Sequence, residues 1–393
     1  MFTHLYLENW RNFSRVDLTL QPRIFLVGAN ASGKSNLLDA FRFLRDIVSV
    51  GGGLQEAVER RGGVSRIRAL SARRSPDVSI RVEVKIPPGN MHWRYSLSFG
   101  NDKTGRPIIK AETVEKQGSK VLQRPGDEDK NDRERLLETY LESNSSNAAF
   151  REIAEFFREI SYLHIIPQLV REPDRSAGFK NDPFGGDFLE QVAKTPIRLQ
   201  RKRLAQIVRA LKVAVPQLKQ LKLERDQSRG TPHLLGKYKH WRPAGAWQNE
   251  EQLSDGTIRL LGLLWAISEG KGPLLLEEPE MSLHPAVVRF IPPMLSRIQE
   301  RQGRQVLVST HSNDLLQDQG IGMNEVVLLI TGEEGTKVQL ASSIADVKEL
   351  LNGGLSIADA VLPHTQPENV EQLTLFSEWN GKKNGHDTLQ GDG

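Results

Sequence analysis

The chain has 393 residues, of which 38% are hydrophobic and 26% are charged, a composition typical of soluble globular proteins with a sizeable core. Its 53 Lys and Arg residues against 49 Asp and Glu residues leave a net charge of +4, which by itself is weak support for a nucleic-acid partner. The absence of cysteine excludes disulfides, thiol catalysis, iron–sulfur clusters and cysteine-based zinc sites. Apolar runs fall short of the roughly 20 residues that span a bilayer, and the first residues lack the pattern of a signal peptide. We therefore expect a cytoplasmic protein without a membrane partner.

The first part of the chain predicts an α/β segment followed by a β-rich segment. Strand-like residues Phe2–Leu7 and Arg23–Val27 flank a polar connection at Asn9–Asp17, and the second strand runs into a glycine-rich turn. Leu37–Val48 has apolar residues at helical spacing and ends before three glycines, which predicts an amphipathic helix. Three β-rich stretches then predict an antiparallel meander, at Asp77–Ile86, His92–Phe99 and Pro107–Glu115.

The middle of the chain changes character and predicts an inserted lobe. A strongly basic helix at Pro196–Val213 precedes a hairpin formed by Gln217–Asp226 and His233–Trp241. From Leu253 the alternation of helices and strands returns, and after Leu362 the chain is polar with Pro and Gly, which indicates disorder. The predicted organisation is one head whose halves are residues 1–168 and 253–362, an inserted lobe at 169–252, and a disordered tail at 363–393.

A glycine-rich loop carries the strongest motif. Residues 28–35 read Gly-Ala-Asn-Ala-Ser-Gly-Lys-Ser and match G-x-x-x-x-G-K-[ST] in full, between an apolar strand and an amphipathic helix. Backbone N–H groups of such a loop bind phosphates, with Lys34 at the β- and γ-phosphates and the Ser35 hydroxyl on Mg²⁺. We therefore predict a nucleoside triphosphate site formed by Gly28, Ala29, Asn30, Ala31, Ser32, Gly33, Lys34, Ser35 and Asn36.

A second element places carboxylates at the end of a buried strand. The segment Pro273-Leu-Leu-Leu-Glu277-Glu278 is apolar until its two acids, and ligands bind at the carboxyl ends of strands in open α/β sheets. Successive residues of a strand point to opposite faces, so the two acids are expected to differ in role. We predict that Glu277 serves Mg²⁺ and that Glu278 is the general base for the attacking water.

Two further segments can be placed near a phosphate. Leu253-Ser254-Asp255-Gly256-Thr257 offers N–H groups and a hydroxyl at the start of a helix, although a plain N-cap explains the same residues equally well. His311 follows the apolar strand Gln305–Ser309, where a γ-phosphate sensor would stand, although most lone histidines are structural.

The order and spacing of these segments resemble the heads of ABC-type ATPases, and more narrowly the RecF/SMC/OLD-like branch. Leu7-Glu-Asn-Trp-Arg11-Asn12-Phe13 and Glu278-Pro-Glu-Met-Ser-Leu-His-Pro285 are similar to segments of the same proteins. The resemblance covers about residues 1–50 and 250–330, whereas the middle matches loosely. It implies an α/β P-loop head in which a mixed sheet is joined to an antiparallel β lobe.

The resemblance also implies roles for particular residues. Ser254 and Gly256, with Asp255 between them, would contact the γ-phosphate held by a second subunit, and His311 would sense it. Arg11 would lie near the nucleotide, and Gln168 is the candidate for the family's Mg²⁺-linked glutamine. The implied cofactors are ATP and Mg²⁺, and the implied assembly is an ATP-dependent homodimer.

Three departures from the family pattern stand out. Glu277 replaces the usual aspartate, which lengthens the reach to a metal by one methylene. Asp255 and Thr257 replace the glycine and glutamine of the signature, and a carboxylate is unfavourable near a triphosphate unless it faces away. Residues 178–245 contain no long heptad run, which argues against an SMC-length coiled coil.

These features leave more than one function open. The first hypothesis is an ATP-hydrolysing switch that passes dimer closure to DNA or to a separately encoded protein effector, in bacterial anti-phage defence or in DNA repair. The alternative is an ATP-sensing scaffold with little turnover that gates an effector such as a nuclease. A third hypothesis, a nuclease-ATPase of the OLD kind, is disfavoured. The residues after His311 lack the Glu and Asp-x-Asp set of a TOPRIM-type nuclease domain.

Two features outside the motifs also have more than one interpretation. The basic residues of the helix Pro196–Val213 could contact phosphates, but a solvated helix face is the commoner explanation. In the tail, the apolar cluster Leu373-Thr-Leu-Phe376 with Trp379 is either a docking element or packs on the head.

Overall fold

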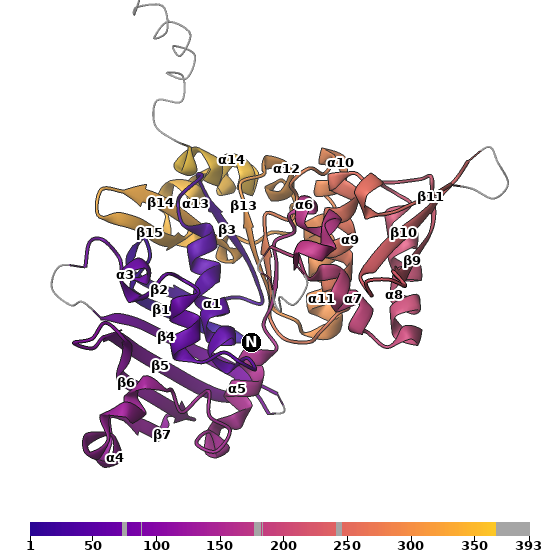
Figure 1. The fold of residues 1–393 in the computed structure, drawn as a ribbon. Helices are drawn as coiled ribbons and strands as arrows, with labels where there is room; N and C mark the ends of the chain where they lie inside the picture. Colours follow the sequence, from indigo (N-terminus) through magenta and orange to yellow (C-terminus); the bar gives the residue numbers. More distant parts are fainter. Residues whose placement is uncertain (73–76, 88, 177–181, 183, 241–245, 367–393) are drawn as a thin grey trace, which may run out of the picture.

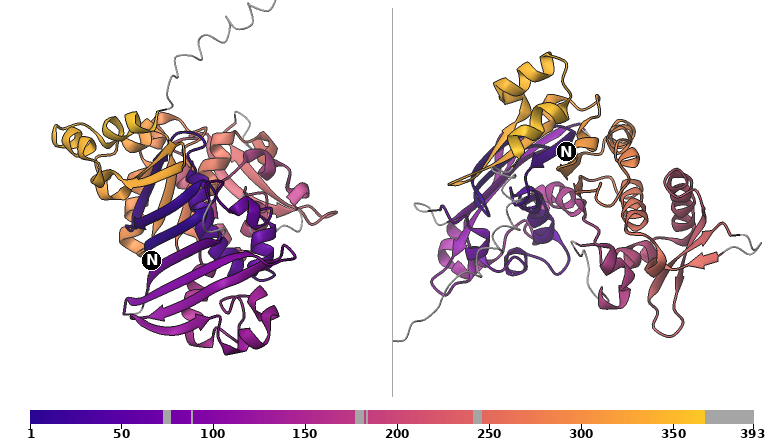
Figure 2. Two further views of the ribbon diagram at one scale, coloured as in Figure 1. Left: turned by 90° about the vertical axis from the view of Figure 1, so that its left-hand side faces the viewer. Right: turned by 90° about the horizontal axis from the view of Figure 1, so that it is seen from above.

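The computed structural model describes residues 1–366 apart from 73–76, 88, 177–181, 183 and 241–245. Its strands form a six-stranded antiparallel sheet, a six-stranded mainly parallel sheet and a three-stranded sheet (Figure 1). Figure 2 shows the antiparallel sheet and the three-stranded sheet on opposite sides of the molecule, with the mainly parallel sheet between them. The tail from residue 367 onward, including its apolar cluster, lies outside the described residues.

The mainly parallel sheet has the strand order β15-β14-β3-β13-β12-β8, and only β15 runs antiparallel to its neighbour. In register, Val27 of β3 lies opposite Thr310 of β13, and Ser309 of β13 lies opposite Glu277 of β12. The carboxyl ends of three neighbouring strands therefore meet at one sheet edge. The strands are β3 (Arg23–Gly28), β8 (Ser161–Leu163), β12 (Leu274–Glu277), β13 (Val306–Thr310), β14 (Val326–Gly332) and β15 (Gly335–Leu340).

The antiparallel sheet contains the predicted meander and extends it on both sides, in the order β2-β1-β4-β5-β6-β7. The expected polar connection Asn9–Asp17 is wrong, because its second half is strand β2 in a hairpin with β1. Val16 and Leu18 alternate there with exposed polar residues, so one face of a short polar segment is buried. The strands are β1 (Phe2–Trp10), β2 (Phe13–Thr19), β4 (Val78–Ile86), β5 (Met91–Asn101), β6 (Pro107–Lys116) and β7 (Ser119–Arg124).

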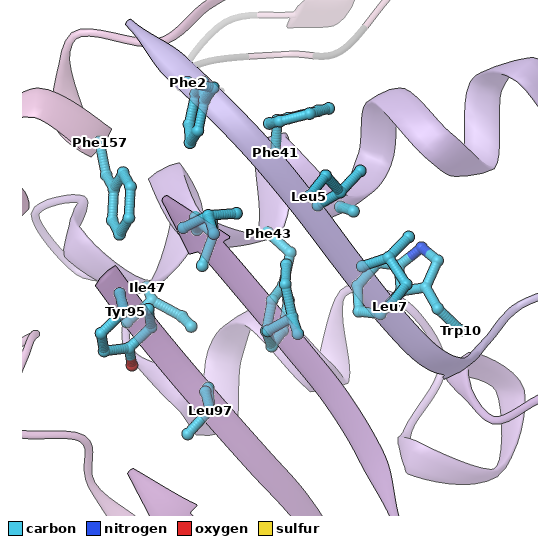
Figure 3. Packing of buried hydrophobic residues seen from close by; sticks show 14 of the residues in the cluster. Phe2, Leu5, Leu7, Trp10, Phe41, Phe43, Ile47, Tyr95, Leu97 and Phe157 are labelled. Atoms are coloured by element: carbon cyan, nitrogen blue, oxygen red, sulfur yellow. The ribbon is translucent and has the colours of Figure 1, made fainter. Parts of the chain in front are cut away.

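Two hydrophobic cores lie on the two faces of the mainly parallel sheet. Ile24 and Leu26 of β3 belong to the first core and Phe25 and Val27 to the second, as the alternation of side chains in a strand requires. In the first core, β1 residues such as Phe2 and Trp10 pack against Phe41 and Phe43 of helix α1 (Figure 3). Helices on the side of the first core are α1 (Lys34–Val48), α2 (Leu54–Glu59), α3 (Val64–Ile67), α4 (Asp127–Asn131) and α5 (Arg151–Arg158).

The predicted lobe at 169–252 contains helices and the three-stranded sheet β11-β10-β9, with the predicted hairpin at β9 and β10. Its buried residues, among them Leu204 and Leu234, share the second core with Leu276 of β12 and with Leu263 of α9 (Asp255–Ser268). The lobe therefore packs directly on the head. Its elements are α7 (Phe188–Lys194), α8 (Ile197–Leu211), β9 (Leu218–Arg225), β10 (Pro232–Tyr238) and β11 (Ala246–Gln248), preceded by α6 (Pro167–Arg171).

The remaining helices follow the return to α/β alternation. The helix expected at Pro285–Arg301 is divided in two, because Pro292 and Pro293 can stand only in the first turn of a new helix. Within the described ranges, no helix combines the length and the apolarity that a bilayer crossing requires. These helices are α9 (Asp255–Ser268), α10 (Pro285–Val288), α11 (Ile291–Gln302), α12 (Asn313–Leu316), α13 (Ala345–Asn352) and α14 (Ile357–Val361).

Candidate functional site

The glycine-rich loop leaves the carboxyl end of β3 and enters α1. Gly33 has a φ of 97°, and a Cβ there would lie 2.2 Å from Nδ2 of Asn12. A Cβ at Gly28 would lie 2.4 Å from Oγ of Ser32 and 2.8 Å from the Leu329 carbonyl oxygen, so both glycines are required by close approach. No described side chain caps the first turn of α1, whose N–H groups are therefore available to an anion.

Asn12 is a site residue that sequence reasoning did not single out. From the turn between β1 and β2, its Nδ2 donates to the Ser32 carbonyl oxygen at 2.9 Å and to Oγ1 of Thr336 at 2.8 Å. Its Oδ1 accepts a hydrogen bond of 2.8 Å from Nδ2 of Asn36. Asn12 thus joins the second half of the phosphate loop and the first turn of α1 to strand β15.

Lys34 is buried within the loop. Its Nζ donates to the carbonyl oxygens of Gly28 and Ala29 at 2.8 and 3.0 Å and lies 3.9 Å from Oε1 of Glu278. Burial lowers the pKa of Lys34, while the carboxylates of Glu278, Glu280 and Glu277 oppose that effect. On the outer rim of the loop, Asn30, Ala31 and Ser35 are exposed. A buried ammonium below an exposed ring of backbone groups suits a multiply charged phosphate.

Glu277 lies between two hydroxyl groups. Its Oε1 accepts a 2.5 Å hydrogen bond from Oγ of Ser35, and its Oε2 accepts one from the Tyr162 hydroxyl of β8. Tyr162 is a second residue that the sequence did not reveal, because β8 precedes β12 by more than a hundred residues. A serine hydroxyl and a carboxylate in contact form a pair of hard oxygen ligands, which fits Mg²⁺.

Glu278 follows the end of β12 and has a φ of 42°. It is therefore separated from Glu277 by a change of backbone conformation, and the expected alternation within one strand does not apply. Its N–H donates to the Ser309 carbonyl oxygen at 3.0 Å, and its Oε1 lies 3.2 Å from Nδ1 of His311. Glu278, His311 and Lys34 thus lie together at the sheet edge.

The signature segment forms the start of α9. Ser254 is exposed and caps the helix, since its Oγ accepts from the Thr257 N–H at 3.3 Å. Asp255 accepts a 2.5 Å hydrogen bond from Nη2 of Arg171, and a Cβ at Gly256 would lie 2.5 Å from the Ser282 carbonyl oxygen. In the described part of the chain, no hydrogen bond or ion pair joins residues 254–256 to the phosphate loop.

Arg259 was also not anticipated as part of the site. It is one turn into α9, where burial lowers the pKa of its guanidinium and the carboxylates of Asp255, Glu278 and Glu280 oppose that effect. This side chain is therefore close to both the signature segment and the acids after β12. Its positive charge attracts Asp255 of the signature segment on one side and Glu278 and Glu280 on the other.

The two residues assigned from the resemblance at the edge of the site lie apart from each other. Arg11 is in the turn between β1 and β2, where its Nη2 lies 3.4 Å from Oδ2 of Asp39 on α1. With Ser35 and Glu277 it lines a cleft of about 1790 Å³ that extends along α1. Gln168 is exposed on α6, and within the described residues its side chain makes no hydrogen bond; its Mg²⁺ role stays a prediction.

This arrangement is that of a P-loop ATPase head, with the glycine-rich loop after β3, the acids after β12 and the histidine after β13 at one edge of the sheet. Residues 23–317 match the family described as "AAA domain, putative AbiEii toxin, Type IV TA system". The chain belongs to this family. Part of its sequence is similar to RecF proteins and its fold is similar to an SMC head, as an ABC-type ATPase of the RecF/SMC family would be. The predicted recognition and fold class are confirmed.

Known relatives match only parts of the chain in sequence. One segment is 35% identical over 89 residues to "DNA replication and repair protein RecF" of Clavibacter sepedonicus, covering 22% of each chain. Another match, to RecF of Lacticaseibacillus casei, is 52% identical over 42 residues and covers 10% of this chain and 11% of the relative. The chain therefore matches no more than 22% of the length of these curated relatives.

The fold is similar along most of the chain to a solved SMC head bound to the C-winged helix domain of ScpA. The TM-score is 0.51 at 14% identity, and the alignment covers 86% of this chain and 96% of that one. At this identity the likeness concerns the fold alone.

Proposed function

We propose that this chain is an ATP-hydrolysing switch that closes as a homodimer around ATP and Mg²⁺ and passes closure to a partner. The observation that carries the proposal is the cluster at one sheet edge. The Ser35 hydroxyl touches Glu277, while Glu278 lies 3.9 Å from Lys34 and 3.2 Å from His311. A phosphate-binding loop, a metal-binding pair and a candidate base are the parts that phosphoryl transfer to water requires.

Each residue would have a distinct task in that reaction. Lys34 and the N–H groups of residues 28–35 hold the β- and γ-phosphates, and Ser35 with Glu277 holds Mg²⁺. The bound Mg²⁺ would neutralise charge on the phosphate oxygens. Glu278 accepts a proton from water as the water oxygen bonds to the γ-phosphorus and the bond to the bridging oxygen breaks. His311, beside Glu278, orients that carboxylate and contacts the γ-phosphate.

Dimerisation is proposed because Ser254 is exposed at the start of α9 and residues 254–256 make no bond to their own phosphate loop among the described residues. In a two-fold assembly, Ser254 and the first N–H groups of α9 would meet the γ-phosphate of the other head. The partner that responds to closure of the dimer is DNA or a separately encoded protein effector. The RecF relatives support a setting in DNA repair, and the matching family supports a toxin-type defence system.

One observation favours the alternative, an ATP-sensing scaffold that turns over little ATP. Glu278 is shared between Lys34 and His311, so these two side chains would retain its carboxylate and keep it from the attacking water. The two functions differ in the steady-state release of phosphate by the wild-type protein, which a scaffold would lack.

The decisive experiment compares Glu278→Gln with Glu277→Gln. Glu278→Gln keeps the volume and removes the basicity, so hydrolysis should fall by about 10²-fold or more while ATP still binds. The ATP-bound dimer should then accumulate, as measured by light scattering. Glu277→Gln should instead weaken Mg²⁺-dependent ATP binding.

The matched control is Glu334→Gln, at an exposed residue in the turn between β14 and β15. It should change neither hydrolysis nor scattering. A Glu278→Gln protein that hydrolyses ATP at the wild-type rate, with Glu277→Gln as the ATP-trapping variant, would reverse the two assignments.

A further inference from the structure

Positive charge is concentrated in one part of the chain. Residues 196–240 contain twelve Lys and Arg residues against two acidic residues, although the whole chain has a net charge of only +4. The rest of the protein is therefore net negative. Such segregation creates a positive field over one lobe that an even distribution of the same charges would not produce.

Helix α8 arranges part of this charge in a stripe, which we call the α8 stripe. Its members share one face because they stand three, four, eleven and fourteen residues after Arg198, offsets that follow the helical repeat. The opposite face, with Leu204, Ile207 and Leu211, is buried in the second core. The members, all exposed, are Arg198, Arg201, Lys202, Arg209 and the C-cap residue Lys212.

The α8 stripe lacks the acidic partners that several other cations of the lobe have. Arg203, on another face of α8, pairs with Glu269 at 3.1 Å and stacks over Trp265. On the hairpin, Arg225 pairs with Glu190 at 3.1 Å. In contrast, no member of the stripe forms an ion pair with any residue that the structure describes. Four other cations of the lobe are thus paired with acids, whereas this row of charge faces the solvent.

We propose that the α8 stripe binds the sugar–phosphate backbone of duplex DNA without reading its sequence. From Arg198 to Lys212 the stripe is about 20 Å long, at 1.5 Å per residue, which is enough to reach several consecutive phosphates. The helix has no aromatic side chain on which single-stranded bases could stack. Apart from Ile197 and Leu199 in its first turn, its large apolar residues are buried in the second core, so the helix has no continuous apolar face to insert into a lipid surface.

The experiment measures the fluorescence anisotropy of a labelled duplex of about 20 base pairs, without nucleotide, at roughly 50 and 200 mM salt. The wild type should bind, and its affinity should fall steeply with salt. The charge reversal Arg201→Glu, Lys202→Glu and Arg209→Glu should weaken binding by about tenfold or more, because it replaces three phosphate contacts by repulsion. Circular dichroism of the same variant verifies that α8 still folds.

The matched control reverses three exposed basic residues elsewhere, Arg297 and Arg301 on α11 and Lys348 on α13. It changes the net charge by the same amount, so binding within about twofold of the wild type would show that position and not total charge is responsible. Equal losses in both variants would overturn the proposal. The proposal would also be overturned if the folded wild type bound no duplex at the lower salt. An acidic protein segment would then be the ligand to test on the α8 stripe.

This test is independent of the ATPase proposal. The α8 stripe shares no residue with the phosphate loop or the acids after β12, so phosphate release without DNA should be the same in the wild type and the stripe variant. If the wild type did not hydrolyse ATP, the DNA measurement would still test the stripe. If the stripe did not bind DNA, the ATPase proposal would still stand.

Discussion

Asp255 stands in the signature segment, where a carboxylate would repel a bound triphosphate. The Arg171 guanidinium compensates for it: its Nη2 lies 2.5 Å from Oδ1 of Asp255 and also donates to the Leu253 carbonyl oxygen at 2.7 Å. This pair explains how the chain tolerates an acid in place of a signature glycine. It joins α6 to the start of α9, next to the exposed hydroxyl of Ser254.

The pair gives a prediction for turnover. Arg171→Ala should lower ATP hydrolysis severalfold, since it leaves the Asp255 charge unpaired near the incoming γ-phosphate. The second substitution Asp255→Gly should restore the rate, because it removes the charge that Arg171 neutralises. Phosphate release by the two single variants and the double variant checks this cycle. If Arg171 only supports the fold, the double variant would be no more active than Arg171→Ala.

Glu280 is a buried carboxyl group two residues after Glu278. Its Oε1 accepts a hydrogen bond from the Thr310 hydroxyl, its Oε2 has no hydrogen-bond partner in the described structure, and burial raises its pKa from 4.5. The native state therefore binds the proton more tightly than the unfolded chain does. Stability must then fall as pH rises from the ordinary value through the raised pKa, and the loss persists at higher pH.

Glu280→Gln tests this dependence, because an amide carries no titrating proton. The free energy of unfolding of the variant, relative to the wild type, should be higher at pH 8 than at pH 5. The increase should be about 1.4 kcal/mol for each pH unit by which the Glu280 pKa in the folded state exceeds 5, the lower pH of the comparison. Urea unfolding at both pH values measures it. An identical difference at pH 5 and pH 8 would show that Glu280 titrates alike in the folded and unfolded states.

At the scale of elements, the turn between β1 and β2 supports the phosphate loop through Asn12. Asn12→Asp keeps the shape but replaces both donated hydrogen bonds by a carboxylate facing the Ser32 carbonyl oxygen and the Thr336 hydroxyl. Loss of donors to such groups costs about 1–3 kcal/mol, so ATP affinity should fall by roughly tenfold or more. Binding of a fluorescent ATP analogue measures the loss. Asn101→Asp, at an exposed strand end, should leave affinity unchanged.

The same element shows what the sequence could and could not predict. The phosphate loop and the acids after β12 were found because each is a contiguous motif at the end of an apolar strand. Asn12, Tyr162 and Arg171 were not assigned roles, since their partners at the site lie 20 or more residues away in sequence and only the sheet order brings them together. Strand β2 was missed because only one of its faces is apolar.

At the scale of the whole molecule, the phosphate loop and the signature segment of one head are not joined by any hydrogen bond or ion pair in the described part of the chain. Ser254→Arg should leave ATP binding to a single head intact and abolish turnover, because a bulky cation would occupy the place of the γ-phosphate contact between two heads. ATP binding by fluorescence and phosphate release measure the two effects. Glu251→Arg, an exposed acid three residues earlier, is the control and should keep its turnover.

Mixing two inactive variants makes this prediction specific to a two-fold assembly. In a dimer of Ser254→Arg with Lys34→Ala, one site pairs an intact phosphate loop with an intact signature, whereas the other site lacks both. Activity should therefore reappear on mixing although each protein alone is inactive, which only a site shared between two chains allows. If the signature acted on its own phosphate loop, neither chain would contain a complete site and the mixture would stay inactive. A Ser254→Arg protein with wild-type turnover would remove the shared site altogether.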